Sequence, residues 1–245
     1  MTQYGFYFDQ SRCYGCQACS VACKDWNDIA PGPEKWMGVY EWEKGTFPDT
    51  RLFELAFSCV HCEHPACISA CKNGAIFKED KYGAVLVDKE KCQGDRNCLD
   101  ACPYGTPRFA DDNKGTKMSK CTMCIDRLEA GDIPMCVASC PMRALDFGPI
   151  DELIEKYGDC RQLEDMPEPA TKPAWVAKPH REHKMLVPLD SKEVIRLSKP
   201  RGSWENIFED DEDLTPPEGV IRRNKLVMKN YTAADVMAAT TNNQG

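Results

Sequence analysis

The spacing of the cysteines constrains this chain more than any other feature of its sequence. Of the sixteen cysteines in 245 residues, fifteen fall into four dense groups. The groups are Cys13, Cys16, Cys19 and Cys23; Cys59, Cys62, Cys67 and Cys71; Cys92, Cys98 and Cys102; and Cys121, Cys124, Cys136 and Cys140. The first group has the spacing C-x2-C-x2-C-x3-C, which is the bacterial ferredoxin pattern for binding an iron–sulfur cluster. Four such groups predict a chain that holds several clusters and moves electrons.

The ferredoxin pattern also predicts which cysteines share a cluster. In two-cluster ferredoxins the fourth cysteine of each run binds the other cluster. Applied to this chain, the rule predicts four sets of iron ligands, which we number 1 to 4. Set 1 is Cys13, Cys16, Cys19 and Cys140; set 2 is Cys23, Cys121, Cys124 and Cys136; set 3 is Cys59, Cys62, Cys67 and Cys102; set 4 is Cys71, Cys92, Cys98 and Asp95.

Asp95 occupies the position where the third group should have its second cysteine. Its carboxylate could bind the fourth iron, since a hard oxygen ligand can replace a thiolate. Alternatively that corner is empty and the cluster has three irons. Either outcome should shift the potential of this cluster relative to the others, because cluster type and charge set the potential. The third reading is a solvated loop residue without a role. The residues themselves leave ligand and vacancy open.

Other uses of the cysteines fit less well. Disulfide frameworks are typical of short secreted chains, and this chain is long. Zinc ribbons use C-x2-C pairs separated by a longer insert, a spacing that the fourth group has but the first lacks. Cys160 lies outside every ligand spacing and is predicted to be a structural thiol.

Composition predicts a chain without a membrane span of its own. Charged residues make up 29%, the mean hydropathy is −0.52 and the net charge is −8, which argues against a nucleic-acid partner. Residues 1–20 contain neither an apolar core nor a twin arginine, so we expect synthesis and folding in the cytoplasm. Membrane association or export with a partner stays open.

Local patterns predict short elements between the cysteine groups. Strands are expected at 4–8, 107–109 and 144–147, a hairpin at 75–78 and 84–87, and helices at 20–26, 124–130 and 151–157. Together they predict an α+β fold of two ferredoxin-like modules, one inserted in the other, wrapped around four clusters. Residues 1–58 and 106–165 would form the outer module and residues 59–105 the inner one.

Residues 166–245 differ from the rest, being rich in proline and charge and including the acidic run 209–213. Such a composition is typical of a solvated extension. We expect instead an extended arm that wraps a partner subunit, because it contains large apolar residues. The expected anchors are Trp175, Trp204, Ile207 and Phe208.

The four groups, with Tyr4-Gly5-Phe6, Cys102-Pro103-Tyr104-Gly105 and the run 140–149, resemble the four-cluster electron-transfer subunits of the dimethyl sulfoxide reductase family. The resemblance covers about two thirds of the chain. It implies a non-catalytic subunit that carries three 4Fe–4S clusters and one 4Fe–4S or 3Fe–4S cluster. Its partners would be a catalytic subunit with a molybdenum or tungsten pterin cofactor and a quinol-linked membrane anchor. Nitrate reductase, in the same family, has a non-cysteine residue in this group and a three-iron cluster, which supports the vacancy at Asp95. The alternative function is a polyferredoxin-like relay in a hydrogenase or formate-linked complex, and a weaker one is a zinc-bearing structural module.

Overall fold

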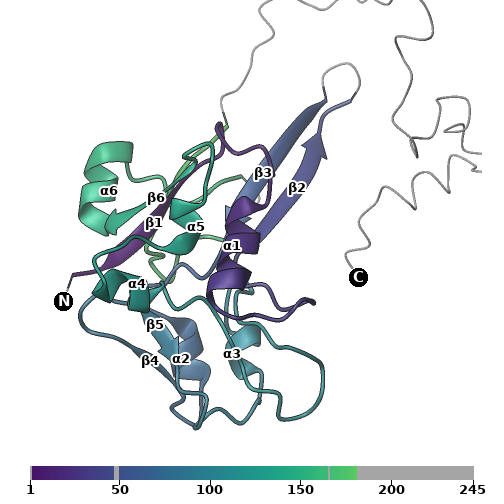
Figure 1. The fold of residues 1–245 in the computed structure, drawn as a ribbon, viewed down its shortest axis with the longest axis vertical. Coiled ribbons are helices and arrows are strands. Elements are labelled where there is room, and N and C mark those ends of the chain that lie inside the picture. Colours follow the sequence, from purple (N-terminus) through teal and green to yellow (C-terminus); the bar gives the residue numbers. More distant parts are fainter. Residues whose placement is uncertain (1, 47–49, 165, 181–245) are drawn as a thin grey trace, which may run out of the picture. The chain divides into compact units, whose positions relative to one another are not determined.

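Short helices and three small sheets make up the part of the chain that the computed structural model describes, residues 2–46, 50–164 and 166–180 (Figure 1). This mixture agrees with the predicted α+β class. The elements are β1 (Tyr4–Asp9), α1 (Ala18–Trp26), β2 (Gly38–Lys44), β3 (Arg51–Phe57), α2 (Ala66–Ala70), β4 (Ile76–Lys78), β5 (Val85–Val87), α3 (Asn97–Asp100), α4 (Ile125–Glu129), α5 (Met135–Ala138), β6 (Leu145–Pro149), α6 (Ile150–Tyr157) and β7 (Trp175–Lys178). None of the helices in these ranges has the length and apolar composition needed to cross a membrane.

The central sheet has three strands in the order β6, β1, β7. β1 runs antiparallel to β6 and parallel to β7. Successive side chains of a strand point to opposite faces, and β1 buries both of its faces. Phe6 and Phe8 enter the main core, whereas Tyr7 packs with Ile150 and Val176 on the side of α6. This double burial explains why the run 4–8 is aromatic rather than alternating with polar residues.

Two antiparallel hairpins, β2–β3 and β4–β5, complete the described part of the chain. Figure 1 shows β4, β5, α2 and α3 gathered at one end, whereas β1, β6 and α6 lie toward the other. Helix α1 packs against α5, and α2 packs against α3. The cysteine-bearing helices therefore meet in two pairs, one made by the first and fourth groups and one by the second and third groups.

Most of the elements predicted from local patterns are confirmed. The strands at 4–8 and 144–147, the hairpin at 75–87 and the helices at 20–26, 124–130 and 151–157 all form, with shifts of a few residues at their ends. The predicted strand at 107–109 is wrong, because a single bridge joins Arg108 to Ser119. Pro107 has no N–H to donate to a strand ladder. The Arg108 side chain donates instead to the backbone carbonyls of Lys35 and Gly105.

The predicted start of the tail at residue 166 is too early, because the folded part of the chain continues to β7. Trp175 is only 3% exposed, and its ring packs against those of Phe8 and Phe57 at centroid distances of 6.5 and 5.5 Å. The expectation that Trp175 anchors a partner is therefore wrong, since its own chain buries it. The other expected anchors and the acidic run lie outside the described residues: Trp204, Ile207, Phe208 and 209–213.

Residues of both predicted modules meet in one core. The N–H of Tyr4 donates to the carbonyl of Tyr82 at 2.9 Å, and the Gln3 side chain donates to the carbonyls of His61 and Gly83 at 3.3 and 3.2 Å. The N-terminal strand therefore binds the inner segment directly. The division into an outer and an inner module stays a prediction.

Replacing Trp175 by alanine should lower the free energy of unfolding by about 3–5 kcal/mol, as expected for truncating a buried aromatic side chain. Thermal unfolding of the purified native complex would measure the effect. Trp26→Ala is the control, because Trp26 is 43% exposed and should cost much less. If Trp175→Ala leaves stability unchanged but releases a partner subunit, the anchor role of Trp175 would have to be restored.

Candidate metal centres

Four C-x3-C pairs lie on four short helices or within two residues of their C-terminal ends. The pairs are Cys19 and Cys23 at α1, Cys67 and Cys71 at α2, Cys98 and Cys102 at α3, and Cys136 and Cys140 at α5. Residues four apart in a helix lie on the same side of adjacent turns. Each helix can therefore present one thiol to each of two neighbouring centres. This local geometry is the physical basis of the exchange of fourth ligands predicted from the sequence.

The members of set 1 line one pocket between the loop after β1 and the end of α5. Cys13 and Cys16 lie in that loop, Cys19 lies in the first turn of α1, and Cys140 follows α5. The pKa of Cys19 is raised to about 12, first by burial and then by the neighbouring thiols of Cys13 and Cys140. The thiols thus lie close together in a site shielded from water.

Set 2 lines a second pocket and is the most deeply buried set. Its members are Cys23, Cys121, Cys124 and Cys136, which are all buried. Burial raises the pKa of Cys136 well above its usual value, and the thiols of Cys121 and Cys124 raise it further. Thiols buried together in such a site are groups that a metal could deprotonate and bind.

Set 3 is identified by the mutual influence of its thiols. The pKa of Cys67 is raised to about 12 by burial first, and the thiols of Cys59, Cys102 and Cys62 raise it as well. The pKa of Cys62 is raised to about 11, again by burial first, with smaller contributions from Cys59 and Cys102. The four cysteines of the predicted set are therefore neighbours, although the sequence places Cys102 thirty-five residues after Cys67.

Set 4 lines a pocket between the end of α2 and the loop that leads into α3, next to β4 of the β4–β5 hairpin. Cys71, Cys92, Cys98 and Asp95 all face this pocket. Asp95 is exposed, and its Oδ2 accepts a hydrogen bond of 2.7 Å from Nδ2 of Asn73. One carboxylate oxygen is thus already engaged by a protein donor at the corner where a fourth thiolate is missing.

The arrangement suits a group larger than a single ion. In the described ranges, no three or more His, Cys, Asp or Glu side chains are arranged to hold one metal ion. A zinc site would need four ligands at about 2.0–2.3 Å from one point. All sixteen cysteines are free thiols in the structure. Sets of four thiols around shared pockets fit a polynuclear iron–sulfur cluster, whose irons are each bound by a separate thiolate.

Backbone N–H groups donate to sulfur atoms in three of the four sets. The contacts are Ala144 N to Cys140 Sγ at 3.3 Å, Met123 N to Cys121 Sγ at 3.3 Å, Ala75 N to Cys71 Sγ at 3.3 Å and Met118 N to Cys92 Sγ at 3.4 Å. Such hydrogen bonds stabilise negative charge on a ligating sulfur and raise the reduction potential of a bound cluster.

His61, between Cys59 and Cys62, has a buried ring nitrogen without a hydrogen-bond partner among the described residues, as expected beside a cofactor with acceptor atoms. Its ring is completely buried, and Nδ1 accepts a hydrogen bond of 2.9 Å from Val85 N, while Nε2 has no partner among the described residues. Burial lowers the pKa of His61 well below its usual value, so the ring is neutral and carries its proton on Nε2. Buried donors without an acceptor are rare, and cluster sulfur would be a suitable acceptor.

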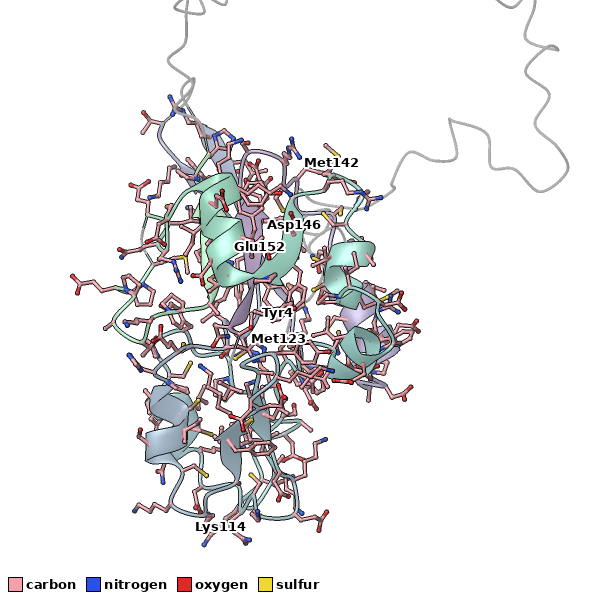
Figure 2. All side chains as sticks on the ribbon, turned by 90° about the vertical axis from the view of Figure 1, so that its left-hand side faces the viewer. Tyr4, Lys114, Met123, Met142, Asp146 and Glu152 are labelled. Atoms are coloured by element: carbon pink, nitrogen blue, oxygen red, sulfur yellow. The ribbon has the colours of Figure 1, made fainter. Side chains whose placement is uncertain are left out.

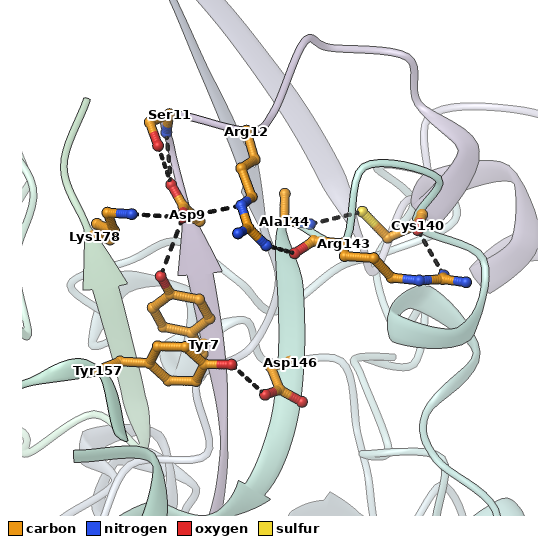
Figure 3. A network of polar contacts seen from close by, with 10 residues as sticks. All are labelled: Tyr7, Asp9, Ser11, Arg12, Cys140, Arg143, Ala144, Asp146, Tyr157 and Lys178. Carbon is orange, nitrogen blue, oxygen red and sulfur yellow. Dashed lines mark hydrogen bonds and ion pairs between the residues drawn. The ribbon is translucent and has the colours of Figure 1, made fainter. Parts of the chain in front are cut away.

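A polar network at the end of β1 holds the first cysteine loop in place (Figure 3). The buried carboxylate of Asp9 accepts hydrogen bonds from Ser11 N at 3.0 Å and from Lys178 Nζ at 3.1 Å. Its backbone carbonyl accepts from Cys13 N at 3.3 Å. Burial alone would raise the pKa of Asp9, but the hydrogen bonds from Ser11 and Lys178 outweigh it and lower this pKa. Asp9 thus ties β7 and the loop of set 1 to the same strand.

The sets follow one another along the described body. Figure 2 shows Met142 toward one end, Met123 in the middle and Lys114 at the opposite end. Met142 lines the pocket of set 1 and Met123 that of set 2, while the loop of Lys114 lies against Gly94 of set 4. The charge of the Cys59 thiolate contributes to the raised pKa of Cys121, so set 3 lies next to set 2. The order of neighbours is therefore 1, 2, 3, 4.

Sequence reasoning assigned no role to three polar residues close to the cysteines of these sets: His61, Asn73 and Lys120. Their positions next to cysteines gave a weak signal, but nothing local shows that His61 and Lys120 are buried. Cys160 lies outside the four sets, and its Sγ donates to the carbonyl of Gln162 at 3.2 Å.

Gly94→Ala should disrupt the loop of set 4. Gly94 has φ +75°, and a Cβ there would lie 2.6 Å from the carbonyl carbon of Gly115 and from the carbonyl oxygen of Thr116. The left-handed backbone costs about 1–2 kcal/mol for alanine, and the collision adds to it. Gly74→Ala is a matched control, with φ +59° but no atom within 4 Å of its Cβ. We expect iron loss in Gly94→Ala alone and a larger fall of its unfolding temperature than in Gly74→Ala; equal effects would assign the cost to backbone conformation.

The chain is similar to one family model and to several known proteins. Residues 51–150 match the family model described as a 4Fe-4S dicluster domain. The chain is 45% identical over 188 residues to the B-chain of anaerobic dimethyl sulfoxide reductase from Escherichia coli (strain K12), covering 73% of this chain and 90% of that protein. It is 36% identical over 243 residues to the B-subunit of sulfite dehydrogenase from Allochromatium vinosum, covering 89% and 96%. It is 41% identical over 152 residues to the thiosulfate reductase electron transfer subunit of Salmonella typhi, covering 61% and 78%.

Proposed function

The chain belongs to the family of iron–sulfur electron-transfer subunits that includes the B-chain of anaerobic dimethyl sulfoxide reductase, and we propose that it relays electrons through four clusters to or from a catalytic subunit. The observation that carries the proposal is the gathering of fifteen cysteines into four adjacent sets. It is an electron-transfer subunit and not a catalytic one.

We assign one cluster to each set, with set 1 held by Cys13, Cys16, Cys19 and Cys140, set 2 by Cys23, Cys121, Cys124 and Cys136, set 3 by Cys59, Cys62, Cys67 and Cys102, and set 4 by Cys71, Cys92 and Cys98. Clusters of this kind accept and release single electrons. The chain's own residues hold them, exclude water around them and donate hydrogen bonds to their sulfur ligands.

At set 4 we propose a three-iron cluster. Asp95 is exposed and its Oδ2 is engaged by Asn73, which supports a carboxylate held at the rim rather than bound to iron. The other three sets each supply four thiolates and would bind 4Fe–4S clusters. The ligand role for Asp95 remains the alternative, and the iron content of an asparagine variant separates the two.

The partner we propose is a catalytic subunit with a molybdenum or tungsten pterin cofactor, and a membrane anchor would complete the complex. The proposal follows from the relatives, which are named as subunits of dimethyl sulfoxide reductase, sulfite dehydrogenase and thiosulfate reductase. Residues after β7 would form the arm that contacts the catalytic subunit. Proteolysis that trims this segment equally fast with and without the partner would contradict the arm.

Metal analysis of the native complex, purified anaerobically through a tag on this chain, tests the proposal. We expect about fifteen irons for this chain, in addition to those of its partners. Molybdenum or tungsten that co-purifies with a larger subunit would support the proposed partner. Iron without either metal would assign the chain to another redox enzyme, such as a hydrogenase. Absence of iron from a folded complex would reject the electron-transfer function.

A further inference from the structure

Lys120 is a buried lysine between two of the cysteine sets. It precedes Cys121 in the sequence and is 3% exposed. Its Nζ donates to the backbone carbonyl of Cys121 at 2.8 Å and to that of Val85 in β5. Within the described ranges no carboxylate lies close enough to form an ion pair with it. An ammonium group has three N–H donors, so two of them are used by the protein backbone.

A buried cation without a counter-ion is costly to a folded protein. The exposed Lys81, by contrast, forms an ion pair of 2.8 Å with Glu129. Lys120 has thiols as neighbours instead. The carbonyl of Cys121 belongs to a member of set 2. Val85, whose carbonyl accepts the other hydrogen bond, donates its own N–H to Nδ1 of His61, between Cys59 and Cys62 of set 3. One ammonium group therefore lies beside both central sets.

The other polar groups nearby do not duplicate this charge. His61 is neutral, because burial and the charges of Lys120 and Lys78 lower its pKa. Lys78 is half-buried, and its Nζ donates to the carbonyls of Cys62 and Glu63. Lys120 alone joins the loop of Cys121 to β5, and no carboxylate of the described residues neutralises it.

We propose that the ammonium group of Lys120 is the internal counter-charge of the clusters in sets 2 and 3 and raises the reduction potential of both. A cluster bound by thiolates carries net negative charge, which grows when the cluster accepts an electron, and nearby positive charge favours the reduced form. Lys120 is a positioning residue and not a ligand. This inference deepens the proposed function and rests on it.

Redox titration of the native complex, followed by electron paramagnetic resonance, tests the proposal. In Lys120→Gln, which removes the positive charge but keeps a polar side chain, we expect two of the four potentials to fall. A tenfold smaller equilibrium constant for accepting one electron corresponds to about 59 mV. The potentials of the clusters in sets 1 and 4 should stay unchanged. Lys120→Arg retains the charge and should restore the wild-type potentials. Lys81→Gln, which removes an exposed charge, should shift none.

The outcomes separate this inference from the proposed function. Complexes without iron would reject the function itself. Clusters present with wild-type potentials in Lys120→Gln would overturn the inference alone, because a purely structural role does not move a potential. If Lys120→Gln and Lys120→Met both fail to load iron while Lys120→Arg loads it, the charge is needed for assembly, which supports the inference. If all three variants fail to load iron, the inference is overturned, because the size of the side chain and not its charge would then determine cluster assembly.

Discussion

Replacing Cys136 by serine should remove about four irons per chain and sharply reduce the amount of folded complex. Cys136 is buried in α5, a helix of four residues that packs against α1. The pKa of its thiol is raised well above the usual value by burial and by Cys121 and Cys124. Without a cluster, set 2 would leave protonated thiols and unfilled space at the centre of the described body, and ligation supplies folding free energy in small metal-binding folds.

Cys160→Ser is the matched control for this substitution. Its thiol is partly buried and donates to the carbonyl of Gln162, away from the four sets. Serine can make the same hydrogen bond, so iron content and unfolding temperature should stay within error of the wild type. The measurements are the ratio of iron to protein and the thermal unfolding midpoint of the native complex. Full iron content in Cys136→Ser and also in Cys136→Ala, whose methyl group cannot bind iron, would show that set 2 is not a metal centre.

Asp95→Cys should add about one iron per chain and convert the proposed three-iron cluster of set 4 into a 4Fe–4S cluster. The new thiol would complete the C-x2-C-x2-C pattern of the third group in the same register as the first. The magnetic resonance signal of an oxidised three-iron cluster should disappear, and the potential of this cluster should fall, because cluster type and charge change together.

The isosteric substitution Asp95→Asn distinguishes a three-iron cluster from a four-iron cluster in which the Asp95 carboxylate is the fourth ligand. If Asp95 does not bind iron, the asparagine variant keeps the wild-type iron content and the three-iron signal. If the carboxylate is the fourth ligand, the wild type already has four irons at this site and the asparagine variant loses one of them. The second result would contradict the proposed vacancy and restore Asp95 to the ligand set.

The grouping of the thiols could be predicted because it depends on short spacings. Two-residue gaps curl a loop around a cluster, and C-x3-C pairs place two thiols on adjacent turns of one helix. The structure places the members of each predicted set side by side, including Cys13 and Cys140, which are far apart in the sequence. Their binding to iron stays a prediction until metal content is measured.

Two structural predictions were wrong because contacts with distant parts of the chain determine the conformation at those positions. Trp175 reads as an exposed anchor in a proline-rich stretch, yet it lies in a parallel strand beside β1. A parallel neighbour far along the chain leaves no local signature, because its partner is chosen by packing. The stretch 107–109 looks like a strand locally, but Pro107 and the side-chain hydrogen bonds of Arg108 leave it with a single bridge.

The linear pattern was enough to predict the cysteine chemistry of this protein, namely the number of cysteine groups and their loop spacing, and several of the helices and strands between them. These features depend on interactions within about ten residues, which a linear pattern shows directly. Which polar groups are removed from water follows only from the packing of distant segments. Lys120 and His61 are ordinary polar residues in the sequence, and their burial depends on β5 and the group-four loop meeting in space. Because desolvation strengthens electrostatic interactions, the charge around the clusters is set by this packing and not by any local motif.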